Sequence, residues 1–90
     1  MCTYVTGNVA VSGSAKGPEG WFGLSRATVS FDHPYHAPLE HSLNIDFAGP
    51  AEATRRVAVE LSAASARALA EAILATLDTG EAAVGAAAYL

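Results

Sequence analysis

The feature that most limits the fold is an alternation of apolar and polar residues, which recurs before residue 62. A period of two places successive side chains on opposite faces of a strand, so each alternating run predicts a strand with one face for a core. The runs predict strands near residues 3–13, 24–33, 40–48 and 55–61. The residues expected on the inward faces are Val5, Val9, Val11, Ala27, Val29, Phe31, His33, His41, Leu43, Ile45, Phe47, Val57, Val59 and Leu61.

The period changes after Ser62, a residue type that caps helices. From Ala66 to Leu77 the apolar residues recur at helical spacing, with Arg67 and Glu71 one turn apart on the polar side. A glycine follows at position 80, where a helix commonly ends. The sequence therefore predicts a helix over about 63–78 and an alanine-rich tail over 81–90.

Together these elements predict an α+β domain, in which a four-stranded, largely antiparallel sheet carries one C-terminal helix packed on one face. Ninety residues suffice for one modest core, which we expect within residues 1–80. The strand order stays open at this stage. A helix about 10 Å wide covers only about half of four strands spaced about 4.8 Å apart. The tail, the segment 21–22 or a second copy of the chain must cover the rest, so we expect a homodimer or a higher homo-oligomer.

Residues 13–20 contain three glycines and a proline, which predicts a long turn between the first two strands. Trp21 and Phe22 follow directly. Two large aromatic residues at this place either cover exposed core or form a lid over a ligand pocket.

Composition excludes several classes of function. The net charge is −4 with only five lysines and arginines, so the chain has no basic stripe for nucleic acid. No apolar run reaches the roughly 18 residues of a membrane span. The N-terminus lacks the basic and apolar regions of a signal peptide, so we expect a cytoplasmic protein without a membrane partner. The single cysteine, Cys2, allows no internal disulfide and is either an inert small residue or a thiol that reaches the site.

All three histidines lie within the ten residues 32–41, which run from the end of the second predicted strand to the start of the third. His33 and His41 continue the apolar faces of those strands. If the strands form a hairpin, the two β-carbons lie within about 5 Å of each other. Two prolines stiffen the loop and hold His36 close to the pair.

Three converging imidazoles match the ligand set of a divalent transition metal, most simply Zn²⁺, with one position open for water or substrate. Asp32 and Glu40 could complete the ligand set, accept the ring N–H groups, or move a proton. This pattern predicts a small enzyme that acts on a small molecule as a hydrolase, lyase or isomerase, with the metal held by His33, His36 and His41.

Three other interpretations fit the same residues. The histidines could line a metal-free pocket for acid–base work or ligand binding. The pocket could hold a metal or small molecule without turning it over. The hairpin could also be purely structural, within an oligomeric module that has no site. The His-x-x-His spacing matches no diagnostic finger or protease pattern.

Several segments resemble a family of short bacterial proteins of unknown function. They are the N-terminal MCTYVTGNVAVSGSAKG, the GWF at 20–22, the histidine-rich DHP, HAP and EH segments between 32 and 41, and AASARALAEAIL from residue 63. The resemblance extends to about Leu77. It implies that the histidine loop is a family feature and that the alanine-rich tail varies, and it implies no catalytic residue.

Overall fold

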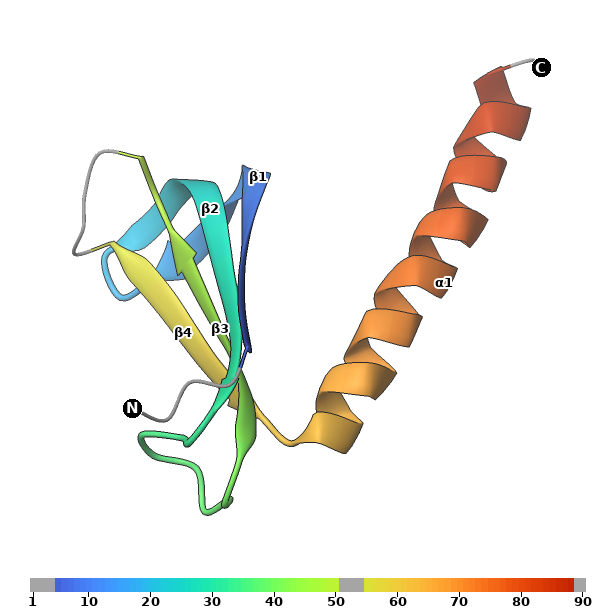
Figure 1. Ribbon diagram of the computed structural model, residues 1–90. Coiled ribbons are helices and arrows are strands. Elements are labelled where there is room, and N and C mark those ends of the chain that lie inside the picture. The colour runs from blue at the N-terminus through green and yellow to red at the C-terminus, as the bar shows by residue number, and fades with distance from the viewer. Residues whose placement is uncertain (1–4, 51–54, 89–90) are drawn as a thin grey trace.

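The computed structural model describes residues 5–50 and 55–88, which form a four-stranded sheet followed by one long helix (Figure 1). The elements are β1 Val5–Gly17, β2 Gly20–Asp32, β3 Ser42–Ala48, β4 Arg56–Leu61 and α1 Ala63–Ala88. Each strand pairs antiparallel with the next, in the order β1-β2-β3-β4. The predicted α+β fold with an antiparallel sheet and a C-terminal helix is confirmed, and the strand order is sequential.

The register separates the two faces of the sheet as the alternation predicts. Three rows form what we call the apolar face: Val5-Phe31-Leu43-Leu61, Gly7-Val29-Ile45-Val59 and Val9-Ala27-Phe47-Val57. The rows between them form the polar face: Thr6-Ser30-Asn44-Glu60, Asn8-Thr28-Asp46-Ala58 and Ala10-Arg26-Ala48-Arg56. The large apolar side chains all stand in the first three rows, and the second set holds only polar residues and alanines. This separation fixes the register, because a slip by one residue would exchange the faces.

The expected long turn over residues 13–20 is wrong. β1 and β2 pair along the whole stretch to Gly17 and Gly20, and only the two residues Pro18–Glu19 form the turn. Gly20 has a φ of 111°, in the left-handed region that glycine adopts without strain. The other glycines of this stretch stay in the strand because the facing strand supplies partners for their backbone groups.

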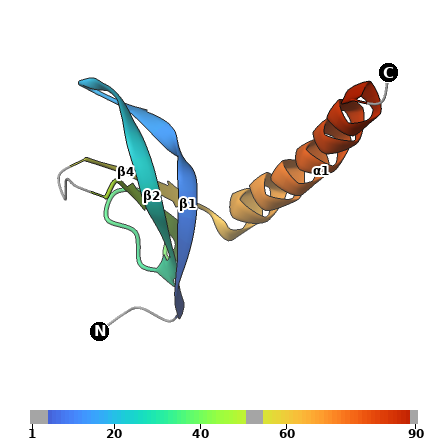
Figure 2. The same cartoon turned by 90° about the horizontal axis from the view of Figure 1, so that it is seen from above.

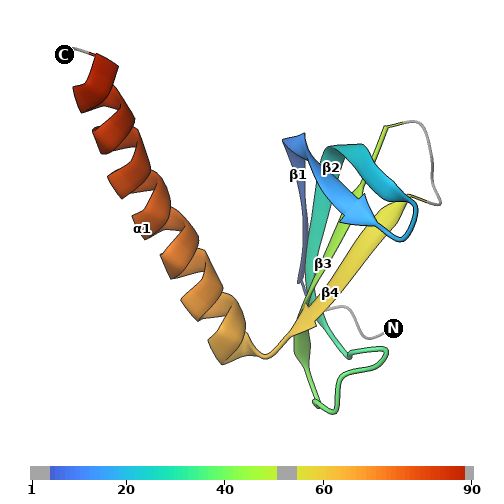
Figure 3. The same ribbon diagram turned by 180° about the vertical axis from the view of Figure 1, so that it is seen from behind.

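The turn end of the β1–β2 hairpin bends across the polar face toward β4 (Figures 1 and 3). A register shift between Ala10 and Gly13 marks the bend, as expected for a β-bulge, which increases local twist. At the bend the strands approach so closely that a β-carbon on Gly49 would lie 2.7 Å from the Gly23 carbonyl oxygen. Ala48 beneath this seam is only 3% exposed.

The two aromatic residues after the turn have different environments. Phe22 is half-buried, and its ring lies beside Gly49, so it covers part of the small core at the seam. Trp21 points the other way and is 67% exposed. Only Phe22 therefore takes the covering role that the sequence suggested for the pair.

The helix α1 begins where the sequence predicts, with the backbone N–H of Ser65 donating to the Ser62 hydroxyl at 3.1 Å. It continues to Ala88, so the predicted end near residue 78 is wrong. Gly80 costs a helix only about 1 kcal/mol relative to alanine, and the alanines that follow favour the helix. Gly20 is the one glycine with positive φ in the described chain, so Gly80 does not form a left-handed cap.

The helix lies on the side of the apolar face but diverges from it (Figures 1 and 2). Its first turns approach β3, whereas its C-terminal half stands clear of the sheet. Ile73, Leu74, Leu77 and Val84 are each 50% exposed or more. Within the described residues, no helix combines the length and the apolarity that a membrane span requires.

Candidate functional site

The polar face holds a pocket of about 720 Å³, which lies beside the loop of residues 33–41. Three carboxylates line this polar-face pocket, those of Asp32, Asp46 and Glu60, together with the guanidinium of Arg56. Thr28, Ser30 and Asn44 add hydroxyl and amide groups, and Pro34 and Tyr35 form the rim on the loop side. Apolar side chains such as Ile45 and Val59 also line the pocket, and the formal charges of the carboxylates and the guanidinium leave two negative charges in excess.

Glu60 ties the loop to the sheet. Its carboxylate accepts backbone hydrogen bonds from Tyr35 at 2.5 Å, Ala37 at 2.8 Å and His36 at 3.1 Å. The bonds from Ala37 and Tyr35 are the main reason why the pKa of Glu60 is lowered, since they stabilise the charged form. One side chain on β4 thus fixes three consecutive amides of the loop.

Sequence reasoning did not identify Glu60 as a site residue. Its polar position in an alternating strand has no local signal that separates it from other solvated strand residues. Its partners lie 23 to 25 residues earlier in the chain, so only the pairing of β4 with β3 brings them together.

Three further pairs of polar side chains form within the sheet. Arg56 donates to both carboxylate oxygens of Asp46. The Thr28 hydroxyl donates to Asn8 Oδ1 at 2.9 Å, from β2 to β1. On β3 the Ser42 hydroxyl donates to Asn44 Oδ1 at 2.6 Å, which leaves the amide nitrogen of Asn44 as a donor for another group.

His33 and His41 lie side by side at the base of the loop, as the hairpin interpretation expects. Their ring centroids are 4.9 Å apart with an interplanar angle of 25°. His41 also stacks on Phe31, with centroids 5.7 Å apart and an angle of 12°. The Nδ1 atom of His33 lies 2.9 Å from the carbonyl oxygen of Glu40, within hydrogen-bonding distance.

The stacking of His33 and His41 does not match the ligand geometry of the predicted metal site. An imidazole binds a metal through a lone pair in the ring plane. Rings that stack nearly parallel direct their lone pairs side by side, so His33 and His41 do not converge on one point as they stand. In the described part of the chain, no three histidine, cysteine, aspartate or glutamate residues are arranged to hold a metal ion.

The remaining predicted site residues are distributed around the same loop. His36 is exposed and contacts Glu60 through its backbone N–H. Asp32 lines the polar-face pocket, and its Oδ1 accepts the backbone N–H of His33 at 2.6 Å. Glu40 is exposed and takes part through its carbonyl oxygen. Cys2 lies outside the described residues.

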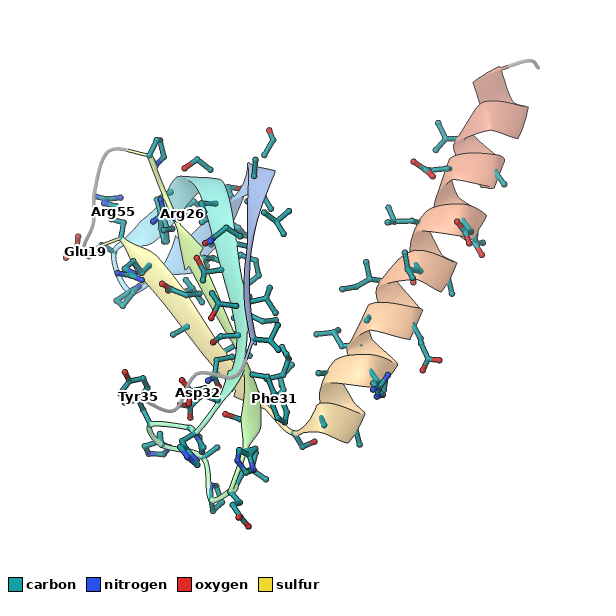
Figure 4. The ribbon with its side chains drawn as sticks, in the orientation of Figure 1. Glu19, Arg26, Phe31, Asp32, Tyr35 and Arg55 are labelled. Carbon is teal, nitrogen blue, oxygen red and sulfur yellow. The ribbon has the colours of Figure 1, made fainter. Side chains whose placement is uncertain are left out.

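Figure 4 shows how the labelled residues divide between the two sides of the sheet. Phe31 lies on the side that faces the helix, whereas Asp32 and Tyr35 lie toward the loop on the opposite side. Phe31 and Asp32, which are consecutive at the end of β2, therefore lie on opposite faces of the sheet, because side chains alternate between the faces along a strand.

Neither the comparison with curated proteins nor the comparison with solved structures gave a match. The sequence does match a family profile over residues 1–87, which includes all five elements nearly in full. The chain therefore belongs to DUF6295, a family of unknown function.

Proposed function

We propose that this protein binds a small, positively charged organic molecule in the polar-face pocket. The observation that carries the proposal is the charge of the lining, where three carboxylates and one guanidinium surround a pocket of about 720 Å³. A volume of this size suits a small molecule, since ligand pockets measure about 300–1,000 Å³. Carboxylates accept hydrogen bonds from ammonium groups, and such charge-assisted bonds are stronger than neutral ones.

The lining also indicates which part of the ligand each group would contact. A carboxylate can accept up to about four hydrogen bonds, so Asp32 could accept one from an ammonium group in addition to the one from the His33 backbone N–H. Asp32 is the carboxylate that we assign to the ligand's ammonium group. The Asn44 amide nitrogen and the Ser30 hydroxyl would bind a neutral polar group of the same ligand. A small amine that also carries hydroxyl groups satisfies both requirements.

The proposal is tested by titration calorimetry and amide NMR with glucosamine, ethanolamine and spermidine, against glucose and phosphate as neutral and anionic probes. We expect the amines to bind and to shift the amides of β2, β3 and residues 33–37. Equal binding of glucose and glucosamine, or shifts confined to other surfaces, would refute the charge-based proposal.

Two variants should change amine affinity in opposite directions. Asp32→Asn removes a ligand-facing charge and should weaken binding about tenfold. Arg56→Gln leaves Asp46 without its cation and should tighten binding, because the pocket becomes more negative. Simple damage to the pocket would weaken binding in both variants. Asp78→Asn on the exposed surface of α1 is the matched control and should leave affinity unchanged.

A second candidate function is metal binding by the three histidines, which is favoured by the 4.9 Å approach of His33 to His41. Binding by both rings requires one ring to rotate out of the stack, and His36 would supply a third nitrogen from the loop. Asp32 and Glu40 would then act on a substrate or a metal-bound water.

Metal content and melting temperature, measured with and without chelator in protein purified without a nickel column, test this candidate. A Zn²⁺ site predicts a stoichiometric ion and a melting temperature that falls with chelator, with His36→Ala losing the ion. If neither chelator nor added Zn²⁺ changes the melting temperature of the wild-type protein, metal binding by the histidines is excluded.

A further inference from the structure

An apolar groove of about 430 Å³ lies between the sheet and α1, on the side opposite the polar-face pocket. Phe31, Leu43 and Ile45 line it from the sheet, and Leu69 and Ile73 line it from the helix. Arg67 is the one charged residue in its lining. The helix and the apolar face therefore share a groove without closing it.

The apolar stripe of α1 continues beyond the groove. Leu74, Leu77 and Val84 are 62%, 50% and 70% exposed, and the C-terminal half of the helix stands clear of the sheet. On the sheet, Val5 and Val9 at the β1 edge are 67% and 51% exposed. One chain thus carries two apolar surfaces, a helical ridge and a sheet face, and its own fold covers neither of them completely.

The total exposed area also indicates that this chain leaves more surface uncovered than a compact monomer does. The chain exposes 6781 Å², whereas a compact monomer of its mass, 9.2 kDa, exposes about 4,900 Å². The radius of gyration is 15.8 Å, against about 12 Å for a compact chain of this length. A standard interface buries about 800 Å² per partner, and obligate homodimers bury more. The surplus of about 1,900 Å² falls within the area that each subunit of an obligate dimer buries, about 1,000–2,500 Å².

We propose that the groove is filled by α1 of a second copy of this chain, and that the two copies exchange helices about a two-fold axis. Each copy has both a helical ridge that contacts no sheet and a groove that its own helix leaves open, so one symmetric contact covers all four surfaces. Such an interface is isologous and closes as a dimer, which leaves no ridge or groove for further assembly.

The charges on α1 favour a protein occupant of this groove over a membrane surface. The charged residues of the helix are Arg67, Glu71, Asp78 and Glu81, one cation against three anions. Helices that lie on anionic lipid have basic polar faces, and this helix would be repelled.

The test is the oligomeric state of the full chain, measured by light scattering and sedimentation at about 10 µM. We expect a species of about 18 kDa, twice the chain mass. Leu77→Glu should dissociate the dimer, with a dissociation constant raised at least about a hundredfold, because the change occurs twice in a symmetric interface. Its far-ultraviolet circular dichroism should retain the sheet, because the C-terminal half of α1 stands clear of the sheet and Leu77 is 50% exposed.

Ala75→Glu is the matched control, since it introduces the same charge on the opposite side of the helix at 100° per residue and should leave the dimer intact. In a mixed sample with one labelled and one unlabelled copy, we expect nuclear Overhauser contacts between Leu77 methyl groups and Ile45 methyl groups of different chains.

Three results would overturn the proposal. The first is a monomeric wild type, in which the helix folds onto its own sheet. The second is a dimer that survives Leu77→Glu and shows contacts between the two β1 edges. The third is vesicle binding by the wild type that abolishes the dimer, which would assign the groove to a lipid surface.

Discussion

The two faces of the sheet differ in how far the chain itself provides partners for their side chains. On the polar face, hydrogen bonds and ion pairs within the chain fix the loop through Glu60 and link the strands through Arg56 and Asp46. On the apolar face the same chain leaves a groove and a helical ridge open. Hydrogen bonds and ion pairs are short and directional, so single residues can satisfy them. Covering an apolar surface instead requires many large apolar side chains, and a chain of ninety residues with many alanines has few of them.

The largest expected effect concerns the open apolar side. Ile73→Ala should cost about 2–4 kcal/mol per chain if a second copy covers this residue, as for a buried isoleucine. If no second copy covers the residue, the loss of unfolding free energy should stay below about 1 kcal/mol, because half of the Ile73 side chain is already exposed. Urea unfolding at two protein concentrations separates the outcomes, since only a dimer gains stability with concentration. Thr79→Ala, away from the ridge, should stay within about 0.5 kcal/mol of wild type.

A second large effect is expected at the seam where the β1–β2 hairpin bends over the polar face. Gly49→Ala places a β-carbon 2.7 Å from the Gly23 carbonyl oxygen, a backbone atom that cannot move alone. We expect a loss of about 1–3 kcal/mol by urea unfolding, the usual range for overpacking. Gly23→Ala is the control on the facing strand, because its β-carbon meets nothing within 4 Å. Equal stability of the two variants would mean that the strands at the seam separate far enough to accept a β-carbon at Gly49.

A local effect is expected at the loop. The folded pKa of Glu60 is lowered, so its charged form contributes stability above the ordinary carboxyl range near 4.3, and that contribution is lost as the pH falls through the lowered pKa. The amide resonances of Tyr35, His36 and Ala37 should therefore titrate together, with a midpoint below about 4.3.

In Glu60→Gln the same three amides should no longer titrate and should exchange faster with solvent, because a neutral amide has one acceptor oxygen in place of two. Glu71→Gln on α1 provides the matched control. A midpoint at the ordinary value, or unchanged exchange in Glu60→Gln, would show that the carboxylate does not hold the loop.

A small gain is expected from Gly80→Ala. The glycine lies inside α1, its added β-carbon meets nothing within 4 Å, and alanine favours a helix by about 0.5–1 kcal/mol. The gain should appear as added helical signal and a higher melting temperature. Instability of this variant would indicate that the helix contacts another surface at Gly80, which would extend the proposed dimer contact toward the C-terminus.

The sequence by itself determined the parts of this protein that depend on local periodicity. The alternation of Val29 with Ser30 and of Ile45 with Asp46 assigned the two faces of the sheet, and the observed rows confirm them. Ser62 as the helix cap was also predictable, since capping is a contact over three residues. The closeness of His33 to His41 followed from the hairpin, because strands joined by a short loop pair beside that loop.

Only the tertiary structure decided the features that join distant segments. The bend of the β1–β2 hairpin over Gly49, the attachment of the loop to Glu60 and the divergence of α1 from the sheet have no local signal. The length of α1 was not predicted, because a glycine such as Gly80 commonly ends a helix. Here the helix propensity of the alanines that follow outweighs the small free-energy cost of the glycine. Local rules describe the preferences of a segment for its neighbours in sequence, whereas these contacts form only after the strands have paired and brought residues more than twenty positions apart together.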